Sequence, residues 1–245
     1  MGCICETLAK PEMSLSDTCI GHLWLFADLG AAEQEAIAEN AIRSIHQPGE
    51  IIFHQGDPAD RMFLIKAGRV KLSKVTEAGS EMTVDIRKEG DFVGENIFGE
   101  DASAGDYPMT ATCMAPTLIC GFSRAAFEGL IMDHPAIGLQ VIRNLSRRIE
   151  WLTGRVGTMA ATNLEDRLYR VLVQVAREHG VADDIGARIQ LPLTHEDLGF
   201  LAGAHRVSVT RAMKALREAG RVVQDGRTLI IPAIRLDGSP APVAP

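Results

Sequence analysis

Between Ile42 and Phe122 the chain breaks into short apolar runs separated by glycines, and this pattern limits the available folds more than any other feature. The runs read IIFH, MFLI, VKLSKV and MTVDI, and the glycines are Gly49, Gly56, Gly68, Gly79, Gly90 and Gly94. Turns this close together leave no room for crossover helices, so the strands should be antiparallel. The region therefore predicts a β-roll or barrel, preceded by a short helix at about residues 31–41.

From Pro135 the apolar period changes from that of strands to that of a helix. Apolar residues recur at alternating steps of three and four, at Ile142, Leu145, Ile149, Leu152, Val156 and Met159. This spacing is typical of two helices packed along their length. A single amphipathic helix lying on its own domain is the alternative. Because no charge interrupts the seam, the pattern favours a helix that forms a homodimer.

The C-terminal part begins with a helical pattern at Leu164–His179, which should end at Gly180, and continues with a strand at Ala187–Leu193. Thr194 and Asp197 then have the spacing of a helix capping box. A second short helix should follow.

That second helix is expected from Arg206 to Ala219, after a turn at Gly203, and should stop at Gly220. Two short helices joined by a tight turn predict a helix-turn-helix. The run VVQDGRTLII that comes next is typical of a β-hairpin, so the motif should be a winged helix.

The second helix has one apolar face and one basic, polar face. Val209, Met213 and Leu216 should pack inward. The residues expected to contact DNA are Arg206, Val207, Ser208, Thr210, Arg211 and Lys214. Arginine can bond guanine O6 and N7 in the major groove, valine can touch a thymine methyl group, and hydroxyls suit phosphate oxygens. The alternative is a solvated basic face on an ordinary helix.

Composition excludes several classes of protein. The formal net charge is −7, which argues against a general coat on nucleic acid but not against a local basic patch. The sequence has no run of membrane-spanning length and no signal-peptide pattern, so we expect a cytoplasmic protein without a membrane partner. Motifs of thiol oxidoreductases, Ser-His-Asp hydrolases, metalloproteases and phosphate-loop enzymes are missing from the sequence, so we do not expect an enzyme.

The order of these parts resembles the Crp/Fnr superfamily of bacterial transcription regulators, from about Leu25 to Ile231. The stretches that carry the resemblance are PGEIIFHQGDPADRMFLIKAGRVKLSK, GDFVGENIFGE, the long helix and LTHEDLGFLAGAHRVSVTRAMKALREAGRV. The resemblance implies an α+β protein that binds a two-fold symmetric operator in double-stranded DNA as a homodimer and contacts RNA polymerase. The alternative is a signal-binding β-roll module or a thiol redox protein without DNA-specific function.

The implied organisation has five parts. They are a cysteine-containing segment (1–24), a β-roll sensor domain of the cyclic-nucleotide-binding type (25–134), a dimerisation helix (135–160), a winged helix-turn-helix (161–234) and a flexible tail (235–245).

By resemblance, Arg206 and Arg211 occupy the base-reading positions of the family. Val207 stands where many members have a glutamate that accepts a hydrogen bond from cytosine, and valine has no acceptor. The half-site should therefore differ from the TGTGA or TTGAT type. The run RVSVTR is similar to that of the nitrogen-control branch of the family, which implies a GTA-type half-site.

The resemblance also places an effector pocket in the β-roll, at Gly94, Glu95 and Asn96. In the cyclic-nucleotide branch, a Gly-Glu pair meets the ribose and phosphate, and an arginine farther along clamps the phosphate. Here the corresponding stretch, EDASAGDYPMTATC, has no basic residue. Because a cyclic phosphate would lack its counter-charge, cAMP is not the expected ligand.

The cysteines suggest a second kind of sensor. Family members that sense oxygen bind an iron–sulfur cluster through N-terminal cysteines and one from the β-roll, which implies a 4Fe-4S cluster on Cys3, Cys5, Cys19 and Cys120, with Cys113 as an alternative ligand. We expect Cys120 after an apolar strand and just before a helix. A thiol switch or the absence of any cofactor is the alternative. Haem is a third possibility, with axial ligands among His22, His46 and His54.

Overall fold

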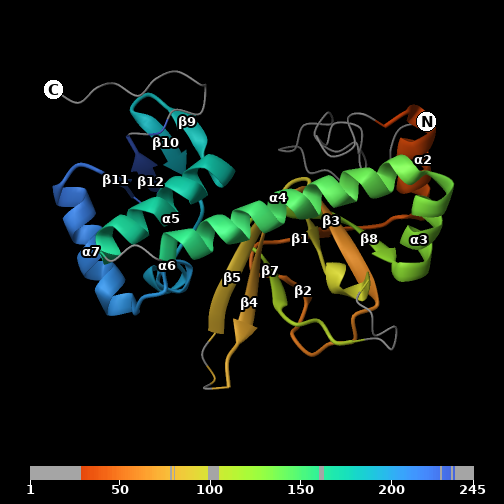
Figure 1. Ribbon diagram of the computed structural model, residues 1–245, viewed down its shortest axis with the longest axis horizontal. Coiled ribbons are helices and arrows are strands. Elements are labelled where there is room, and N and C mark those ends of the chain that lie inside the picture. The colour runs from red at the N-terminus through yellow and green to blue at the C-terminus, as the bar shows by residue number, and fades with distance from the viewer. Residues whose placement is uncertain are drawn as a thin grey trace. The chain divides into compact units, whose positions relative to one another are not determined.

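The structure, a computed structural model, describes residues 29–77, 79, 81–98, 105–159, 163–226, 228–232 and 234. The chain divides into two compact units, Met1–Ile149 and Glu150–Pro245 (Figure 1). The first is built mainly of strands and the second mainly of helices with a small sheet, which confirms the α+β class. Within the described part, no helix is both long enough and apolar enough to cross a membrane.

The first unit is an antiparallel β-roll. Helix α2 (Ala31–Asn40) comes first. The strands that follow are β1 (Ile42–His46), β2 (Ile51–Phe53), β3 (Arg61–Ala67), β4 (Arg69–Val75), β5 (Glu81–Lys88), β6 (Phe92–Val93), β7 (Thr110–Cys113) and β8 (Thr117–Ser123). They form two sheets, with the orders β1-β8-β3-β6 and β2-β7-β4-β5. All the pairs are antiparallel, as the closely spaced glycine turns predict.

Apolar side chains from both sheets form the core of the roll. Met62 and Leu64 of β3 are buried, and β3 pairs along its length with β8. Helix α3 (Arg124–Asp133) begins at Ser123, whose hydroxyl accepts a hydrogen bond from the Ala126 amide. It contributes Phe127, whose ring packs edge-on against Phe122 at 5.4 Å between centroids. The core therefore closes one end of the roll with aromatic contacts.

Helix α4 (Pro135–Met159) runs beside the roll (Figure 1). One of its faces is buried, and a second, apolar face is exposed. Ile137, Gln140 and Asn144 are buried. The apolar side chains left exposed are Leu139, Ile142, Leu145, Ile149 and Leu152, which are 36–62% exposed. The side chains of Val156 and Met159, which the sequence adds to the seam, lie outside the described part.

The second unit contains α5 (Leu164–His179), β9 (Val181–Asp183), β10 (Gly186–Ile189), α6 (His195–Ala202), α7 (Arg206–Glu218), β11 (Val223–Asp225) and β12 (Thr228–Ile231). Its sheet has the order β11-β12-β10-β9. Helix α5 begins and ends as its sequence predicts. Its cap, Asn163, accepts a hydrogen bond from the Glu165 amide at 2.9 Å.

The strand predicted at Ala187–Leu193 is shorter than expected, and its partner β9 was not predicted. Strand β10 ends at Ile189. The Leu193 amide donates to the Leu191 carbonyl at 2.8 Å, which forms a tight turn around Pro192. Because proline has no amide hydrogen for a neighbouring strand, the ladder stops before it.

Candidate functional site: a nucleic-acid interface and a β-roll cavity

Helix α6 begins with the capping box that the sequence predicts. The Thr194 hydroxyl accepts a hydrogen bond from the Asp197 amide at 3.0 Å, and the Asp197 carboxylate accepts one from the Thr194 amide at 2.9 Å. These bonds satisfy two backbone donors that a helix start leaves unpaired. Asp197 is itself buried, so the start of α6 is fixed in position.

The turn between α6 and α7 depends on two glycines. Gly203 adopts a left-handed conformation, with φ of +62°, which glycine enters without strain. Gly199 was not singled out by the sequence. A Cβ atom there would lie 2.6 Å from the Ala204 carbonyl oxygen, so only glycine lets the chain pass this close to α6. The turn therefore sets where α7 begins.

Helix α7 divides into the two predicted faces. Val209, Ala212, Met213 and Leu216 are buried at 0–3% exposure. On the outer face, Arg206, Val207, Thr210, Arg211 and Lys214 are exposed and Ser208 is partly buried. Val207 is 63% exposed. An apolar side chain this exposed next to two arginines suits contact with a base edge better than packing.

A chain of hydrogen bonds joins the start of α6 to the outer face of α7, and sequence reasoning missed it. Thr210 donates its hydroxyl proton to the Arg206 carbonyl at 3.0 Å. His195 Nδ1 lies 2.9 Å from the same hydroxyl oxygen, which is hydrogen-bond distance. Burial lowers the pKa of His195, and the positive charges of Arg217 and Arg206 lower it further. The Thr210 hydroxyl is thus already bonded within the motif.

Two basic residues outside α7 hold the motif together. Arg167 of α5 donates through Nε to the Ala202 carbonyl at 2.6 Å, at the end of α6. Arg221 pairs with Asp166 at 2.8 Å and stacks over the Tyr169 ring at 3.9 Å. Because these cations bond protein groups, they position the motif and are not the first candidates for DNA contact.

The predicted hairpin is present as β11 and β12, joined at Asp225 and Gly226. Arg188 of β10 ties it to the rest of the sheet through Asp225 at 2.9 Å and Asp183 at 2.8 Å. Hydrogen bonds to these two carboxylates raise the pKa of Arg188. Arg217 of α7 bonds Gln224 of β11, which joins the helix to the wing.

The β-roll contains a cavity of about 340 Å³ lined mainly by apolar side chains. It is bounded by Phe53, Leu72, Gly94, Glu95, Asn96, Phe98, Pro108 and Met109. The three residues expected in an effector pocket are therefore all on its wall, and this lining contains no basic residue. Gly94 has φ of +80°, and a Cβ there would lie 2.8 Å from the Arg61 carbonyl oxygen.

Tyr107, which lies in the stretch that has no basic residue, has a structural role. Its hydroxyl donates to the Arg61 carbonyl at 2.6 Å and accepts from the Arg61 amide at 3.1 Å. Its ring stacks on Phe53, with 3.8 Å between centroids. Tyr107 is 3% exposed and supports the cavity wall through Phe53.

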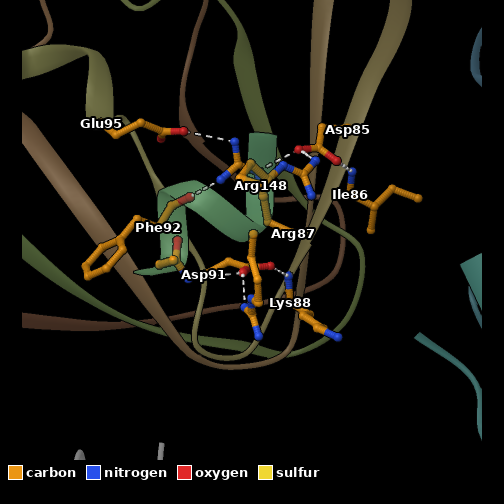
Figure 2. A network of polar contacts seen from close by, with 10 residues as sticks. Asp85, Ile86, Arg87, Lys88, Asp91, Phe92, Glu95 and Arg148 are labelled. Carbon is orange, nitrogen blue, oxygen red and sulfur yellow. Dashed lines mark hydrogen bonds and ion pairs between the residues drawn. The ribbon is translucent and has the colours of Figure 1, made fainter. Parts of the chain in front are cut away.

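A buried network of charges extends from the cavity to helix α4 (Figure 2). Arg87 donates to Glu95 at 2.9 Å, to Asp85 at 2.7 Å and to the Phe92 carbonyl at 2.8 Å. Arg148 of α4 contacts the same Asp85 carboxylate. Sequence reasoning missed this network. The signal it offered was an acid and a base, Asp85 and Arg87, two positions apart on a strand, because such residues point to the same face of the sheet.

A second contact between the roll and α4 lies beside the first. Asn144 donates to the Gly90 carbonyl at 3.0 Å, and Arg147 lies 3.6 Å from Asp91. Asp91 also accepts a hydrogen bond from the Lys88 amide at 2.9 Å. Asn144 and Arg147 thus attach α4 to the turn between β5 and β6, next to the contact of Arg148 with β5.

Of the predicted cluster ligands, only Cys113 and Cys120 are among the described residues; Cys3, Cys5 and Cys19 lie outside them, as does His22. Cys120 lies inside β8 rather than after a strand, because β8 continues to Ser123. Both thiols are buried in the core, and burial raises the pKa of Cys113. The described residues contain no group of three or more histidine, cysteine or acidic side chains arranged for a metal.

The two histidines of the haem alternative that are described lie apart from the core. His46 bonds the Ser44 hydroxyl at 2.9 Å and lies 3.5 Å from Glu50. His54 is exposed, and its amide donates to the Asp57 carboxylate at 2.9 Å.

Comparisons with known proteins agree with both units. Residues 45–134 match the cyclic nucleotide-binding domain family, and residues 166–235 match the Crp-like helix-turn-helix domain. The global nitrogen regulator of Synechocystis sp. is 31% identical over 200 residues, which cover 81% of this chain and 85% of that protein. The CRP-like cAMP-activated global transcriptional regulator of Mycobacterium tuberculosis is 28% identical over 184 residues, covering 75% and 80%.

Solved structures show the same fold. The c-di-GMP responsive global regulator CLP of Xanthomonas campestris superposes with a TM-score of 0.69 at 21% identity, over 82% of this chain and 99% of that one. The relatives are transcriptional regulators rather than enzymes. Together with the winged helix and the β-roll, these matches show that the chain belongs to the Crp/Fnr superfamily of transcription regulators.

Proposed function

We propose that the protein is a homodimeric, sequence-specific transcription regulator whose β-roll binds a small molecule. The observation that supports this most is the outer face of α7, where Arg206, Val207 and Arg211 are exposed on a helix fixed from behind by its buried face. A single α-helix fits the major groove, where base edges can be distinguished. The formal net charge of −7 opposes indiscriminate binding to DNA and leaves affinity to this face.

Base reading would come from three neighbouring side chains. Arg206 and Arg211 would bond guanine bases and Val207 would contact a thymine methyl group, which agrees with the proposed GTA-type half-site. Lys214 pairs with Glu218 at 3.7 Å on an exposed surface. Because such pairs contribute little, Lys214 can turn to a phosphate. Ser208 is also proposed to contact phosphate.

The exposed apolar face of α4 supports the homodimer. In the single chain, a stripe of apolar side chains on this helix is exposed to solvent; it consists of Leu139, Ile142, Leu145, Ile149 and Leu152. Contiguous exposed apolar surface of this kind marks an interaction site, and the three-four spacing suits a second copy of the same helix. Two copies would present two α7 helices to a two-fold symmetric operator. Contact with RNA polymerase is proposed from family membership alone.

The cavity supports a small-molecule signal other than cAMP. Among the described residues, its wall is mostly apolar and Glu95, an acid, is the charged member. An anionic phosphate would meet that carboxylate, and none of the described lining residues is a cation, whereas phosphate recognition depends on charge-assisted hydrogen bonds. We therefore propose an uncharged or cationic organic ligand with an apolar body.

A 4Fe-4S cluster remains the alternative signal. Thiolates are the ligands that such clusters use. Cys120 is 0% exposed in the middle of β8 and packs in the core, so a cluster would need this strand to open. The buried position of Cys120 favours the cavity over the cluster as the site of the signal.

Alanine at Arg206 or Arg211 should weaken binding to the preferred duplex by about 1–3 kcal/mol and relax the preference at one base pair. A duplex selected from a random pool and a scrambled duplex would be titrated by fluorescence anisotropy. Arg170→Ala, at an exposed position of α5, serves as the control and should bind as the parent does. If both variants bound the two duplexes with parental affinities, α7 would not be the reading helix.

The variant Ile142→Glu should dissociate the dimer, because it places a carboxylate in the apolar seam of both copies. Burying an isoleucine side chain is worth about 1.5–3 kcal/mol, counted twice in a symmetric dimer, so the dissociation constant should rise by about 100-fold or more. Sedimentation equilibrium measures this. Arg143→Glu puts the same group one residue along, off the seam, and should stay dimeric. A monomeric parent would contradict the dimer.

The cluster alternative has a direct assay on protein purified without oxygen. We expect no broad absorption near 400 nm (about the region of iron–sulfur charge transfer) and no stoichiometric iron or sulfide. Such a band with matching iron and sulfide, lost in Cys120→Ser, would move the signal from the cavity to the cysteines. A sharp Soret peak would instead indicate haem.

A further inference from the structure

The charges in Figure 2 join a residue of the cavity wall to the helix that carries the apolar seam. We propose that Arg87 and Asp85 are the relay of the sensor: they transmit the state of the Glu95 carboxylate to Arg148, and thereby set how firmly residues 144–149 of α4 are held on the roll. The inference rests on the proposed function of the β-roll as a sensor and assigns residues to it.

Glu95 is the end of the network that a ligand can reach. It lines the cavity, and its side chain is 31% exposed, whereas those of Arg87 and Asp85 are 6% and 3% exposed. One of its oxygens, Oε1, accepts from Arg87. A ligand that donates a hydrogen bond or places a positive charge at this carboxylate would compete with Arg87 for it.

Two arginines of the network share the Asp85 carboxylate. Arg87 bonds both Glu95 and Asp85, and Arg148 contacts Asp85. If a ligand binds Glu95, Arg87 loses one of its two carboxylate partners and keeps Asp85, which it shares with Arg148. In a site shielded from water, the attraction that holds each cation is strong and depends steeply on geometry. Arg87 would then draw further on Asp85, and the hold of Asp85 on Arg148 would weaken.

The position of Arg148 makes this loss matter for the seam. It lies on α4 directly before Ile149, and the neighbouring contact through Asn144 and Asp91 is only one turn away. Arg87 also bonds the carbonyl of Phe92, which follows Asp91 in the chain. A shift of Arg87 therefore acts on both attachments of α4, the one at Asn144 and the one at Arg148. Each of these residues directly precedes a residue of the seam.

The test is hydrogen exchange in the free full-length protein, with Glu95→Gln in place of a ligand. Glutamine keeps the size of the side chain and removes the charge that Arg87 binds. We expect the amides of residues 144–149 to exchange at least about fivefold faster than in the parent, the low end of usual coupling between sites. Amides of β8 and α5 should be unchanged, which separates local release from general loss of stability.

Asn96→Ala is the matched control. Asn96 lines the same cavity, but its amide donates to the Asp106 carbonyl at 3.4 Å rather than to the network. It should leave α4 unchanged. Equal exchange at residues 144–149 in the parent, Glu95→Gln and Asn96→Ala would overturn the relay.

A double variant tests whether the effect passes through Asp85 and Arg148. With Arg148→Met, the contact between Asp85 and α4 is already lost, so adding Glu95→Gln should change the exchange of α4 no further. Additive effects of the two substitutions would mean that Glu95 acts on α4 by another route. Because exchange is read without DNA, failure of the relay and failure of DNA recognition give separate results.

Discussion

Helix α4 has to satisfy two requirements with a single sequence, and the organisation of the first unit depends on this. One face, with Ile137 and Asn144, is buried on the β-roll, while another face keeps Ile142 and Ile149 exposed. At 3.6 residues per turn, a helix can hold such faces side by side over many turns. A change in how the first face is held therefore changes the orientation of the second without any rearrangement of the helix itself.

The attachment of α4 to the roll is apolar at Ile137 and polar farther along, at Asn144 and Arg148. Asp85 and Arg87 are almost fully buried. Buried ion pairs often give no more stability than apolar residues of the same size, whereas loss of one partner is costly, at about 3–5 kcal/mol. An apolar contact in this place would hold α4 without responding to charge. In the proposed relay, these pairs make the contact sensitive to the charge of Glu95, as a protein that converts ligand binding into a change of population requires.

Local signals in the sequence predicted the DNA-binding motif well. The capping box of Thr194, the turn at Gly203, the buried face of Val209 and the hairpin at Asp225 all depend on residues within a few positions of each other. The seam of α4 was predictable for the same reason. Strand β10 ended early because a turn at Pro192 outweighed its apolar pattern.

The contacts that sequence reasoning missed join distant segments. The contact of Asp85 with Arg148 spans strand β5 and helix α4, and a one-dimensional pattern does not show which buried charges meet. The bond between His195 and Thr210 crosses from α6 to α7 in the same way. The cavity wall also required the fold, since Phe53 and Met109 reach it from separate strands and turns. In the sequence, the stretch 105–109 showed only that it lacks a basic residue, not that it contributes to a cavity wall.

If two copies of α7 read one operator, the DNA that the full-length protein selects from a random pool of duplexes will carry that symmetry. We expect an inverted repeat whose half-sites lie about 10–10.5 base pairs, or roughly 34 Å, apart from centre to centre, the spacing of one helical turn of DNA. Enrichment of single half-sites, of direct repeats or of no sequence at all would contradict it.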